Sequence, residues 1–301
     1  MDFSFPQIDS VPLTHVNFRG CSFDMLRLDL LDKQGTGNKF FKLKYNFQDL
    51  VKSGIRSAAT FGGAFSNHIA AFAEIGHRLG IKTAGIIRGE RMVEQNPTLI
   101  KAEANGMILF YMNRTDYRNK DITSIGHDLK AALGEYRLIP EGGSSVEGVK
   151  GAAEIMDFVP DGYGLVCCPV GTGGTLAGLI NSGYKADFLG FSSLKGAFSL
   201  QGDIENKIAE RRGNWKLNHD FSFGGYAKMN DELFQFMKDF HQETSILLDP
   251  VYNAKAVFGL CQLLRTGQLA DYKNILTIHT GGLQGIEGMG WLNERYAYPT
   301  F

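Results

Sequence analysis

The sequence predicts an α/β fold in which a mostly parallel sheet is covered by helices on both faces. From about Arg56 onward, short apolar or β-branched runs alternate with segments of helical periodicity, and glycine-rich turns separate them. Strands that alternate with helices form parallel sheets with both faces buried. With 301 residues and 44% hydrophobic content, the chain is long enough to bury such a core.

The predicted elements follow in order along the chain. The first helix begins within GTGNKFFKLKYNF, where a glycine turn delivers Asn38 and Lys39. Strand and helix segments then alternate through SAATFGG, AFSNHIAAFAEIGHRLG, IKTAGIIRG, TLIKAEANG, MILFYM, YRLIPEGGSS, VEGVKGAAEIMDFV, YGLVCCPVGTGGTLAGLINSG and YKADFLGFSSL. Two further helices, DELFQFMKDFHQETS and NAKAVFGLCQLLRTG, precede the buried-strand pattern NILTIHTGG. No linker rich in proline, serine or charge divides the chain, so composition places no domain boundary.

Charge and composition exclude several classes of protein. A net charge of −1 provides no basic field for nucleic acid, and no apolar run reaches membrane-spanning length. The first residues contain no basic stretch followed by an apolar one, so we expect a cytoplasmic protein. The four cysteines lack disulfide or metal spacing and are predicted to be core residues. We find no metal-ligand pair and no Gly-x-Ser-x-Gly elbow, so we expect neither a metal hydrolase nor a serine hydrolase.

Three loops follow predicted strands, at the sheet edge where ligands gather. PVGTGGTLAG could surround a phosphate with backbone N–H groups, or it could be a tight turn that needs glycine only for its backbone. The loop lacks the Lys-Ser/Thr pair of a Walker A motif, and it lacks the third glycine of the dinucleotide-binding fingerprint. A nucleotide site is therefore disfavoured. In GGAFSNH, Ser66 or Asn67 could cap the helix, or the helix start could bind a carboxylate. In TIHTGG, we interpret His279 as a core histidine rather than a catalytic one.

The lysines of the first segment have two interpretations. Lysines on most helices face water, so Lys39, Lys42 and Lys44 could all be exposed. The segments taken together, however, resemble the family of 1-aminocyclopropane-1-carboxylate deaminases and D-cysteine desulfhydrases, which are pyridoxal-phosphate enzymes of the tryptophan-synthase β fold (fold type II). GNKFFKLKY, GGAFSNH and GTGGTLAGL match family motifs in order and spacing, as do IPEGGSS, LDPVYNAK and IHTGG.

The resemblance implies a role for each matching residue. Lys39 would form the Schiff base with the cofactor, and Lys42 would lie near its phosphate. The implied catalytic residues are Lys39, Ser66, Tyr226 and Tyr252, the implied phosphate loop is Gly171, Thr172, Gly173, Gly174 and Thr175, and the implied substrate pocket is Ser66, Asn67 and His68. Asn67 would also bind the pyridoxal ring hydroxyl, and Thr280 would face the ring nitrogen. No metal is implied.

The resemblance also implies an architecture. A larger cofactor-binding domain would comprise residues 1–52 and 145–301, with a smaller α/β domain inserted at 53–144 and the cofactor between them. The expected partners are a small amino-acid substrate and a second copy of the chain in a homodimer, with neither nucleic acid nor a membrane.

Two positions favour one reaction of the family over the other. The ring-opening deaminases carry glutamate after the tyrosine of DPVY, where this chain has Asn253, and the desulfhydrases use a threonine that Thr280 matches. We therefore expect D-cysteine desulfhydrase-like β-elimination, giving a 2-oxo acid and ammonia. Asn253 and the SSVEG segment also depart from the desulfhydrase pattern, which leaves the substrate open. The alternatives are cyclopropane ring opening, a non-catalytic pyridoxal-phosphate-binding protein and, more remotely, a nucleotide-dependent oxidoreductase.

Overall fold

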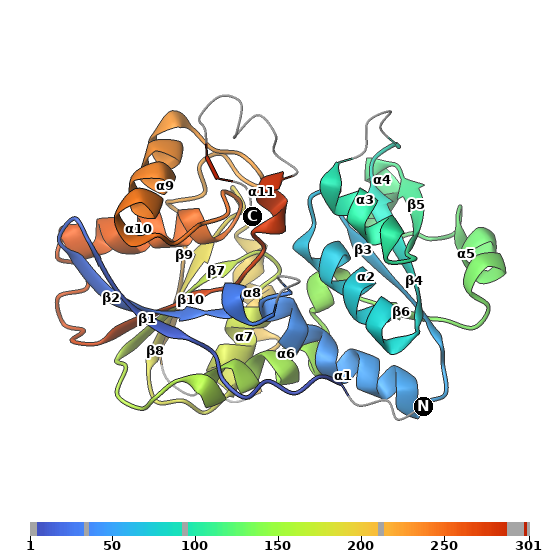
Figure 1. The fold of residues 1–301 in the computed structure, drawn as a ribbon, viewed down its shortest axis with the longest axis horizontal. Helices are drawn as coiled ribbons and strands as arrows, with labels where there is room; N and C mark the ends of the chain where they lie inside the picture. The colour runs from blue at the N-terminus through green and yellow to red at the C-terminus, as the bar shows by residue number, and fades with distance from the viewer. Residues whose placement is uncertain (1–4, 33–35, 92–95, 210–213, 288–297, 300–301) are drawn as a thin grey trace.

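The structure is a computed structural model that describes residues 5–32, 36–91, 96–209, 214–287 and 298–299. Gly35, at the start of the lysine-bearing segment, lies outside these residues. The strands form two separate sheets that lie side by side, the larger one on the left of Figure 1 and the smaller one on the right. The mostly parallel α/β architecture expected from the sequence is confirmed.

Within the described residues, the larger sheet has six strands in the order β1-β2-β10-β7-β8-β9, and the smaller has four in the order β5-β4-β3-β6. All neighbours are parallel except β1 and β2. The strands are β1 Leu13–Phe18, β2 Cys21–Arg27, β3 Ser57–Gly62, β4 Lys82–Arg88, β5 Ile108–Met112, β6 Arg137–Ile139, β7 Leu165–Val170, β8 Asp187–Ser192, β9 Trp215–Asn218 and β10 Ile275–His279. The antiparallel hairpin of β1 and β2 precedes the βα pattern and was not predicted.

Helices cover both sheets. They are α1 Asn38–Lys52, α2 Asn67–Leu79, α3 Pro97–Ala104, α4 Arg114–Asn119, α5 Gly126–Leu133, α6 Val146–Ala153, α7 Gly174–Asn181, α8 Ser199–Glu205, α9 Asp231–Thr244, α10 Asn253–Arg265 and α11 Gln284–Glu287, with the 3-10 helices η1 Leu28–Leu30, η2 Glu141–Gly143 and η3 Glu154–Phe158. Within the described ranges, no helix combines the length and the apolar composition that crossing a membrane requires.

Strand β7 shows why the central strands are apolar throughout. Successive side chains of a strand point to opposite faces. Val166 and Cys168 accordingly enter one hydrophobic cluster, whereas Leu165 and Cys167 enter the other. All four cysteines of the chain are free and buried, as the sequence predicted. A strand with a core on each face has no polar side, which is the pattern of a parallel strand between two helix layers.

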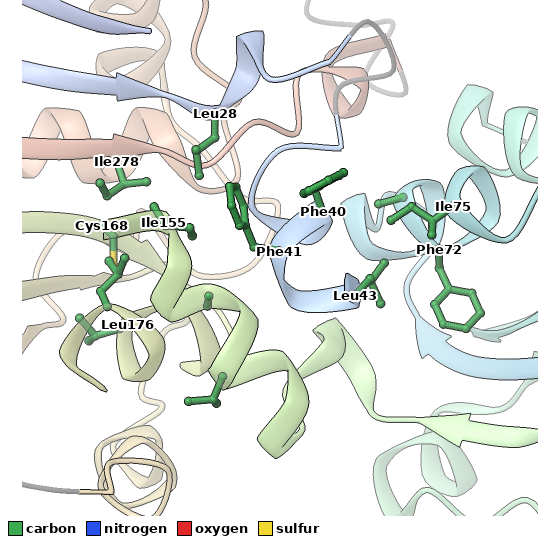
Figure 2. Close-up of a cluster of buried hydrophobic side chains, with 14 of the residues drawn as sticks. Leu28, Phe40, Phe41, Leu43, Phe72, Ile75, Ile155, Cys168, Leu176 and Ile278 are labelled. Carbon is green, nitrogen blue, oxygen red and sulfur yellow. The ribbon is translucent and has the colours of Figure 1, made fainter. Parts of the chain in front are cut away.

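Helix α1 connects the cores beneath the two sheets. Phe40, Phe41 and Leu43 on α1 lie in the same cluster as Phe72 of α2, beside the smaller sheet, and Ile278 of β10, in the larger one (Figure 2). Helix α6 packs against the backbone of α1, because a Cβ added to Gly151 would lie only 1.9 Å from the Phe41 carbonyl oxygen. The first turns of α1 are therefore held from several sides.

Candidate active site

A cavity of about 290 Å³ opens at the carboxyl ends of strands from both sheets. Its lining includes Gly63 after β3, Glu141 after β6, Gly171 after β7 and Thr280 after β10. Loops at this edge lead into helix N-termini, whose N–H groups lack partners within the helix. The cavity is thus the place where the fold is best suited to bind a small ligand.

Lys39 lies in the first turn of α1 and lines the cavity. The turn before it requires glycine: Gly37 has φ 55°, and a Cβ there would lie 2.3 Å from the Thr280 carbonyl oxygen. The Asn38 N–H donates to that same oxygen at 3.1 Å. The Lys39 ammonium donates to the Asn38 side-chain oxygen at 2.8 Å, and burial lowers the pKa of Lys39 to about 8 despite the Asp249 carboxylate. The lowered pKa makes the neutral form of the Lys39 amine more accessible than it is in an exposed lysine.

Lys42 lies one turn further along α1 and is 2% exposed. Burial, followed by the charges of Lys39 and Lys207, lowers its pKa well below the usual value. Its ammonium donates to Ser144 Oγ at 3.1 Å, and no ion pair joins it to a carboxylate within the described residues. A buried cation is costly unless an anion accompanies it. Lys42 therefore marks an anion site rather than a solvated helix face.

The loop after β7 completes that site. Gly173, with φ 79°, caps α7, and a Cβ on Gly174 would lie 2.9 Å from Lys42 Nζ. The first N–H groups of α7 and the buried ammonium thus lie at the same spot, which suits a phosphate. The Thr175 hydroxyl accepts from the Asn38 amide at 2.8 Å, so this loop is bonded to the lysine-bearing helix.

The opposite wall contains the start of α2. Ser66 Oγ accepts the Ile69 N–H at 3.3 Å, so Ser66 caps the helix and also lines the cavity. The Thr60 hydroxyl donates its proton to the Ile139 carbonyl at 2.8 Å. Thr60 Oγ1 also lies 2.8 Å from His68 Nε2, and in this second contact it can only accept. The proton of the His68 ring is therefore on Nε2.

His68 is consequently a neutral hydrogen-bond acceptor. Burial, followed by the charges of Lys39 and Lys42, lowers its pKa well below the usual value, so Nδ1 carries no proton. That nitrogen is buried and has no partner within the described part of the chain. His68 Nδ1 could accept a hydrogen bond from a donor group on a ligand. A ligand carboxylate has no such donor and would instead bind the Ser66 hydroxyl and the N–H groups of α2.

Two tyrosines stand together in the cavity. Their rings meet edge to face with centroids 6.2 Å apart, and both line the cavity. Burial raises the pKa of Tyr226 to about 12 and that of Tyr252 well above its ordinary value. Tyr226 is 37% exposed and lines the cavity. Both hydroxyls keep their protons at neutral pH and can donate them.

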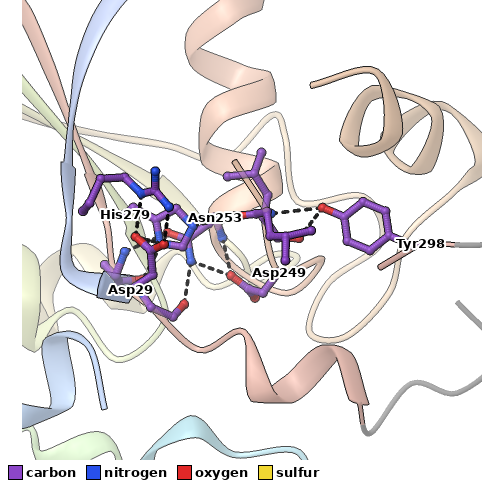
Figure 3. Close-up of polar contacts among 10 residues, drawn as sticks. Asp29, Asp249, Asn253, His279 and Tyr298 are labelled. Atoms are coloured by element: carbon purple, nitrogen blue, oxygen red, sulfur yellow. Dashed lines mark hydrogen bonds and ion pairs between the residues drawn. The ribbon is translucent and has the colours of Figure 1, made fainter. Parts of the chain in front are cut away.

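Asn253 holds Thr280 at the edge of the cavity, and its contact with Asp249 is drawn in Figure 3. Its Nδ2 donates to Asp249 Oδ1 at 2.5 Å and to the Gly281 carbonyl at 2.9 Å, while its Oδ1 accepts the Thr280 N–H at 2.9 Å. Because the carboxylate and the carbonyl only accept and the N–H only donates, the amide has a single possible orientation. The Thr280 hydroxyl lies 3.3 Å from the same Oδ1. Asn253 thereby holds both the backbone and the side chain of Thr280.

Below Thr280, His279 belongs to the core, as the sequence predicted. It is 1% exposed, its Nε2 contacts the Leu247 carbonyl at 2.8 Å and its Nδ1 lies 3.2 Å from Asp29. Arg27 donates to both Asp29 oxygens, at 2.8 and 2.5 Å. These contacts join the end of β2 to the end of β10 and support the loop that carries Thr280 (Figure 3).

The structure brings almost all the predicted site residues together. The cavity is lined by Lys39, Lys42, Ser66, Asn67, His68, Gly171, Thr172, Gly173, Thr175, Tyr226, Tyr252 and Thr280. Gly174 is the predicted residue outside this lining, and its backbone begins α7 beside Lys42.

Sequence reasoning missed several residues of the site. Asn38, Arg88 and Glu141 line the cavity, and Ser144 binds Lys42. Arg88 ends β4, so the rule that ligands lie at the carboxyl ends of strands could have identified it. Glu141 accepts from the Tyr117 hydroxyl at 2.6 Å and from Lys120 at 2.5 Å, and no local sequence pattern predicts those contacts.

Comparisons with known proteins agree with this geometry. A family profile described as pyridoxal-phosphate dependent enzyme matches residues 25–281. A Thermotoga maritima protein named provisionally as a 1-aminocyclopropane-1-carboxylate deaminase is 30% identical over 89% of this chain and 90% of its own. The mitochondrial bifunctional D-cysteine desulfhydrase/1-aminocyclopropane-1-carboxylate deaminase of Arabidopsis thaliana is 26% identical over 86% of this chain and 72% of its own. A crystal structure of a 1-aminocyclopropane-1-carboxylate deaminase homologue superposes with a TM-score of 0.82 at 26% identity, covering 95% of this chain and 93% of the other.

The residues of the cavity fit this cofactor. The buried ammonium of Lys42 and the N-terminus of α7 form a site for its phosphate, and Lys39 provides an amine whose lowered pKa favours the neutral, nucleophilic form. The two helix-covered, mostly parallel sheets are those of the tryptophan-synthase β fold. The chain belongs to the family of pyridoxal-phosphate-dependent enzymes.

Proposed function

We propose that this enzyme eliminates a β-leaving group from a small amino acid, with D-cysteine as the model substrate, from which it releases hydrogen sulfide, ammonia and a 2-oxo acid. The observation that carries the proposal is the chemistry at the Thr280 end of the cavity, where a hydroxyl lines the cavity. The nearby Asp249 carboxylate is fully buried and accepts the N–H groups of Val251, Tyr252 and Asn253 instead. A hydroxyl at the ring nitrogen favours elimination over reactions that store carbanion charge.

Several residues of the cavity have roles in this reaction. Bound pyridoxal phosphate supplies the electron withdrawal that makes the substrate Cα–H acidic. Lys39 is the general base that takes this proton, and the electron pair left behind forms the Cα=Cβ bond as the Cβ–S bond breaks. The sulfur leaves with its bonding pair and takes a proton from a tyrosine of the cavity, a role for which we propose Tyr252. Cβ then takes a proton as the Cα=Cβ bond becomes a Cα=N bond, and water adds at Cα and displaces ammonia, which gives the 2-oxo acid.

The remaining residues bind and orient. Ser66 and the N-terminus of α2 hold the substrate carboxylate, Asn67 binds the ring hydroxyl, and Lys42 with residues 171–175 holds the phosphate. His68 contributes an acceptor to the same wall. Tyr226 stands across from Tyr252 and shapes the space above the substrate.

Cyclopropane ring opening is the second candidate, because the names of both relatives include that activity. The purified protein, supplied with pyridoxal phosphate, distinguishes the two. Sulfide and pyruvate should form from D-cysteine faster than 2-oxobutyrate forms from 1-aminocyclopropane-1-carboxylate, and L-cysteine tests the stereochemical preference. The reverse order of rates would refute β-elimination as the main activity.

Borohydride reduction tests the position of the cofactor. The reduced protein should carry a pyridoxyl group on Lys39, identified by mass spectrometry of its peptides. A label on Lys42 or Lys44 would overturn the assignment of the base. A protein that binds no pyridoxal phosphate would refute the function as a whole.

Three broader proposals accompany this function. We propose that residues 53–144 form the inserted domain, which is supported by the position of β3 to β6 within that range. The four buried free thiols support a cytoplasmic location. The homodimer is proposed from the family resemblance, and analytical ultracentrifugation tests it.

A further inference from the structure

Lys255 is a buried charged group that the proposed chemistry does not use. It lies in the first turn of α10 and is 1% exposed. Its ammonium donates to the Ser222 carbonyl at 2.9 Å and to the Gly225 carbonyl at 2.6 Å. No ion pair links it to a carboxylate within the described residues. Because a buried ammonium is costly unless hydrogen bonds compensate it, the two carbonyl bonds are the feature that needs a lysine at this position.

The segment that Lys255 binds has an unusual backbone. Phe223, Gly224, Gly225 and Ala227 have φ values of 50°, 91°, 111° and 54°, so two non-glycine residues adopt the left-handed region. Such residues persist only where surrounding contacts impose the conformation. Tyr226 lies within this run, directly after the carbonyl that receives the shorter of the two Lys255 bonds.

One further contact fixes the segment internally, and another holds it against the same helix. The Gly225 N–H donates to the Ser222 carbonyl at 2.9 Å, and the Phe223 ring meets Phe258 of α10 edge to face at 5.0 Å. Lys255 and Phe258 are one turn apart on α10, and Tyr252 precedes the first residue of that helix. Helix α10 therefore carries one of the two cavity tyrosines itself and binds the loop that carries the other.

We propose that Lys255 is a positioning residue whose two hydrogen bonds hold the loop of residues 222–228 in the conformation that places Tyr226 over the cavity. The lysine acts through Tyr226 and touches no ligand. This inference rests on the proposed function only in so far as Tyr226 contributes to turnover. The holding of the loop is independent of that role and can be measured separately.

The first test measures loop mobility by hydrogen exchange in protein without added cofactor. Lys255→Met keeps the length of the side chain and removes its donors. It should raise amide exchange in residues 222–228 by about tenfold or more and leave the peptides of β3 and β4 unchanged. Lys228→Met is the matched control, because Lys228 is an exposed lysine of the same loop. Unchanged loop exchange in Lys255→Met would overturn the proposal.

The second test is a double-mutant cycle on kcat. If Lys255 acts through Tyr226, then Lys255→Met and Tyr226→Phe should each lower kcat about tenfold, and the double variant should be no slower than Tyr226→Phe alone. If the double variant instead lost kcat by the product of the two single losses, Lys255 would act independently of Tyr226, which would overturn the inference. A Tyr226→Phe variant with full activity would refute the role of Tyr226, while the exchange result would still decide whether Lys255 holds the loop.

A variant that fails to fold also gives an answer. Lys255→Gln retains an amide donor on a shorter side chain and should show an intermediate increase of loop exchange. If both Lys255→Met and Lys255→Gln unfold as a whole, Lys255 supports the core rather than the loop, which contradicts the proposal.

Discussion

The Thr280 end of the cavity and the wall that contains His68 differ in how completely their polar groups are bonded. On the wall from the larger sheet, Asn253 uses both its donors and its acceptor, and the Asn38 amide bonds Thr175. On the wall from the smaller sheet, His68 Nδ1 is buried without a partner in the described part of the chain. Full bonding before a ligand arrives is preorganisation, whereas an open acceptor gains its bond only from the ligand. The bonded groups around Thr280 therefore suit a group that stays bound, whereas His68 Nδ1 on the second wall gains a partner, and Lys42 at the phosphate end an anionic one, only when a ligand enters.

The largest expected effect comes from the preorganised wall, at Lys39. Lys39→Ala should lose turnover by about 10³-fold or more, because the base that takes the Cα proton is removed. The variant should still fold, since the side chain packs little, and circular dichroism checks this. Lys44→Ala is the matched control on the same helix, because Lys44 pairs with Glu154 outside the cavity. Equal activity of the two variants would contradict the assignment of Lys39.

Thr280 tests the part of that wall that selects the reaction. Thr280→Val keeps the shape and the N–H bond to Asn253 but removes the hydroxyl, so β-elimination should slow by about 10- to 100-fold and the visible absorbance of the cofactor-loaded protein should shift. Thr280→Ser, which retains a hydroxyl, should stay within a few-fold of the unmodified enzyme. Unchanged spectrum and turnover in Thr280→Val would remove Thr280 from the mechanism.

His68 tests the incompletely bonded wall. His68→Leu removes the acceptor and should raise KM by about tenfold with a smaller change in kcat, because a lost ligand bond of this kind contributes on the order of 1.4 kcal/mol. His68→Gln, which keeps an acceptor, should recover most of the affinity. A variant in which kcat falls and KM stays constant would place His68 on the chemical step instead.

The smallest effect is the contribution of His68 to acid stability. An unfolded histidine binds a proton near pH 6.5, whereas burial lowers the pKa of His68 in the folded protein well below that value. Between the two values the unfolded chain holds more protons, so the free energy of unfolding decreases as pH falls below about 6.5, by up to about 1.4 kcal/mol per pH unit. Urea titrations of cofactor-free protein at pH 7.5 and 5.5 should show a smaller loss for His68→Gln. An identical loss would mean that His68 titrates normally.

The sequence predicted the parts of the site that follow local rules. Glycine turns after apolar strands located the loops of Gly171 and Ser66, because those turns are read within a few neighbouring residues. The resemblance added Tyr226 and Tyr252, which no local pattern distinguishes from core aromatics. Both tyrosines line the cavity, although their catalytic roles stay predictions.

What the sequence did not predict depends on residues far apart in the chain. The hairpin of β1 and β2 was missed because its outer strand is partly exposed and its alternation is weak, and it is positioned by pairing between β2 and β10. Asn253 stood out as a departure from the family pattern, yet its meaning required the contacts with Asp249, Thr280 and Gly281. Lys255 resembled an ordinary helix lysine until its burial and its two carbonyl partners were known.

The backbone contact between Gly37 and Thr280 has a consequence for biosynthesis. The lysine-bearing helix begins against a carbonyl that lies 243 residues later in the chain, since 280 − 37 = 243. Domains form as they leave the ribosome, so β3 to β6 can assemble while that carbonyl is still untranslated. During this interval the site around Lys39 and Lys42 is incomplete, so the two amines are less buried. Their pKa and reactivity therefore stay close to those of ordinary lysine side chains. The nascent chain should therefore acquire its cofactor only after β10 has emerged.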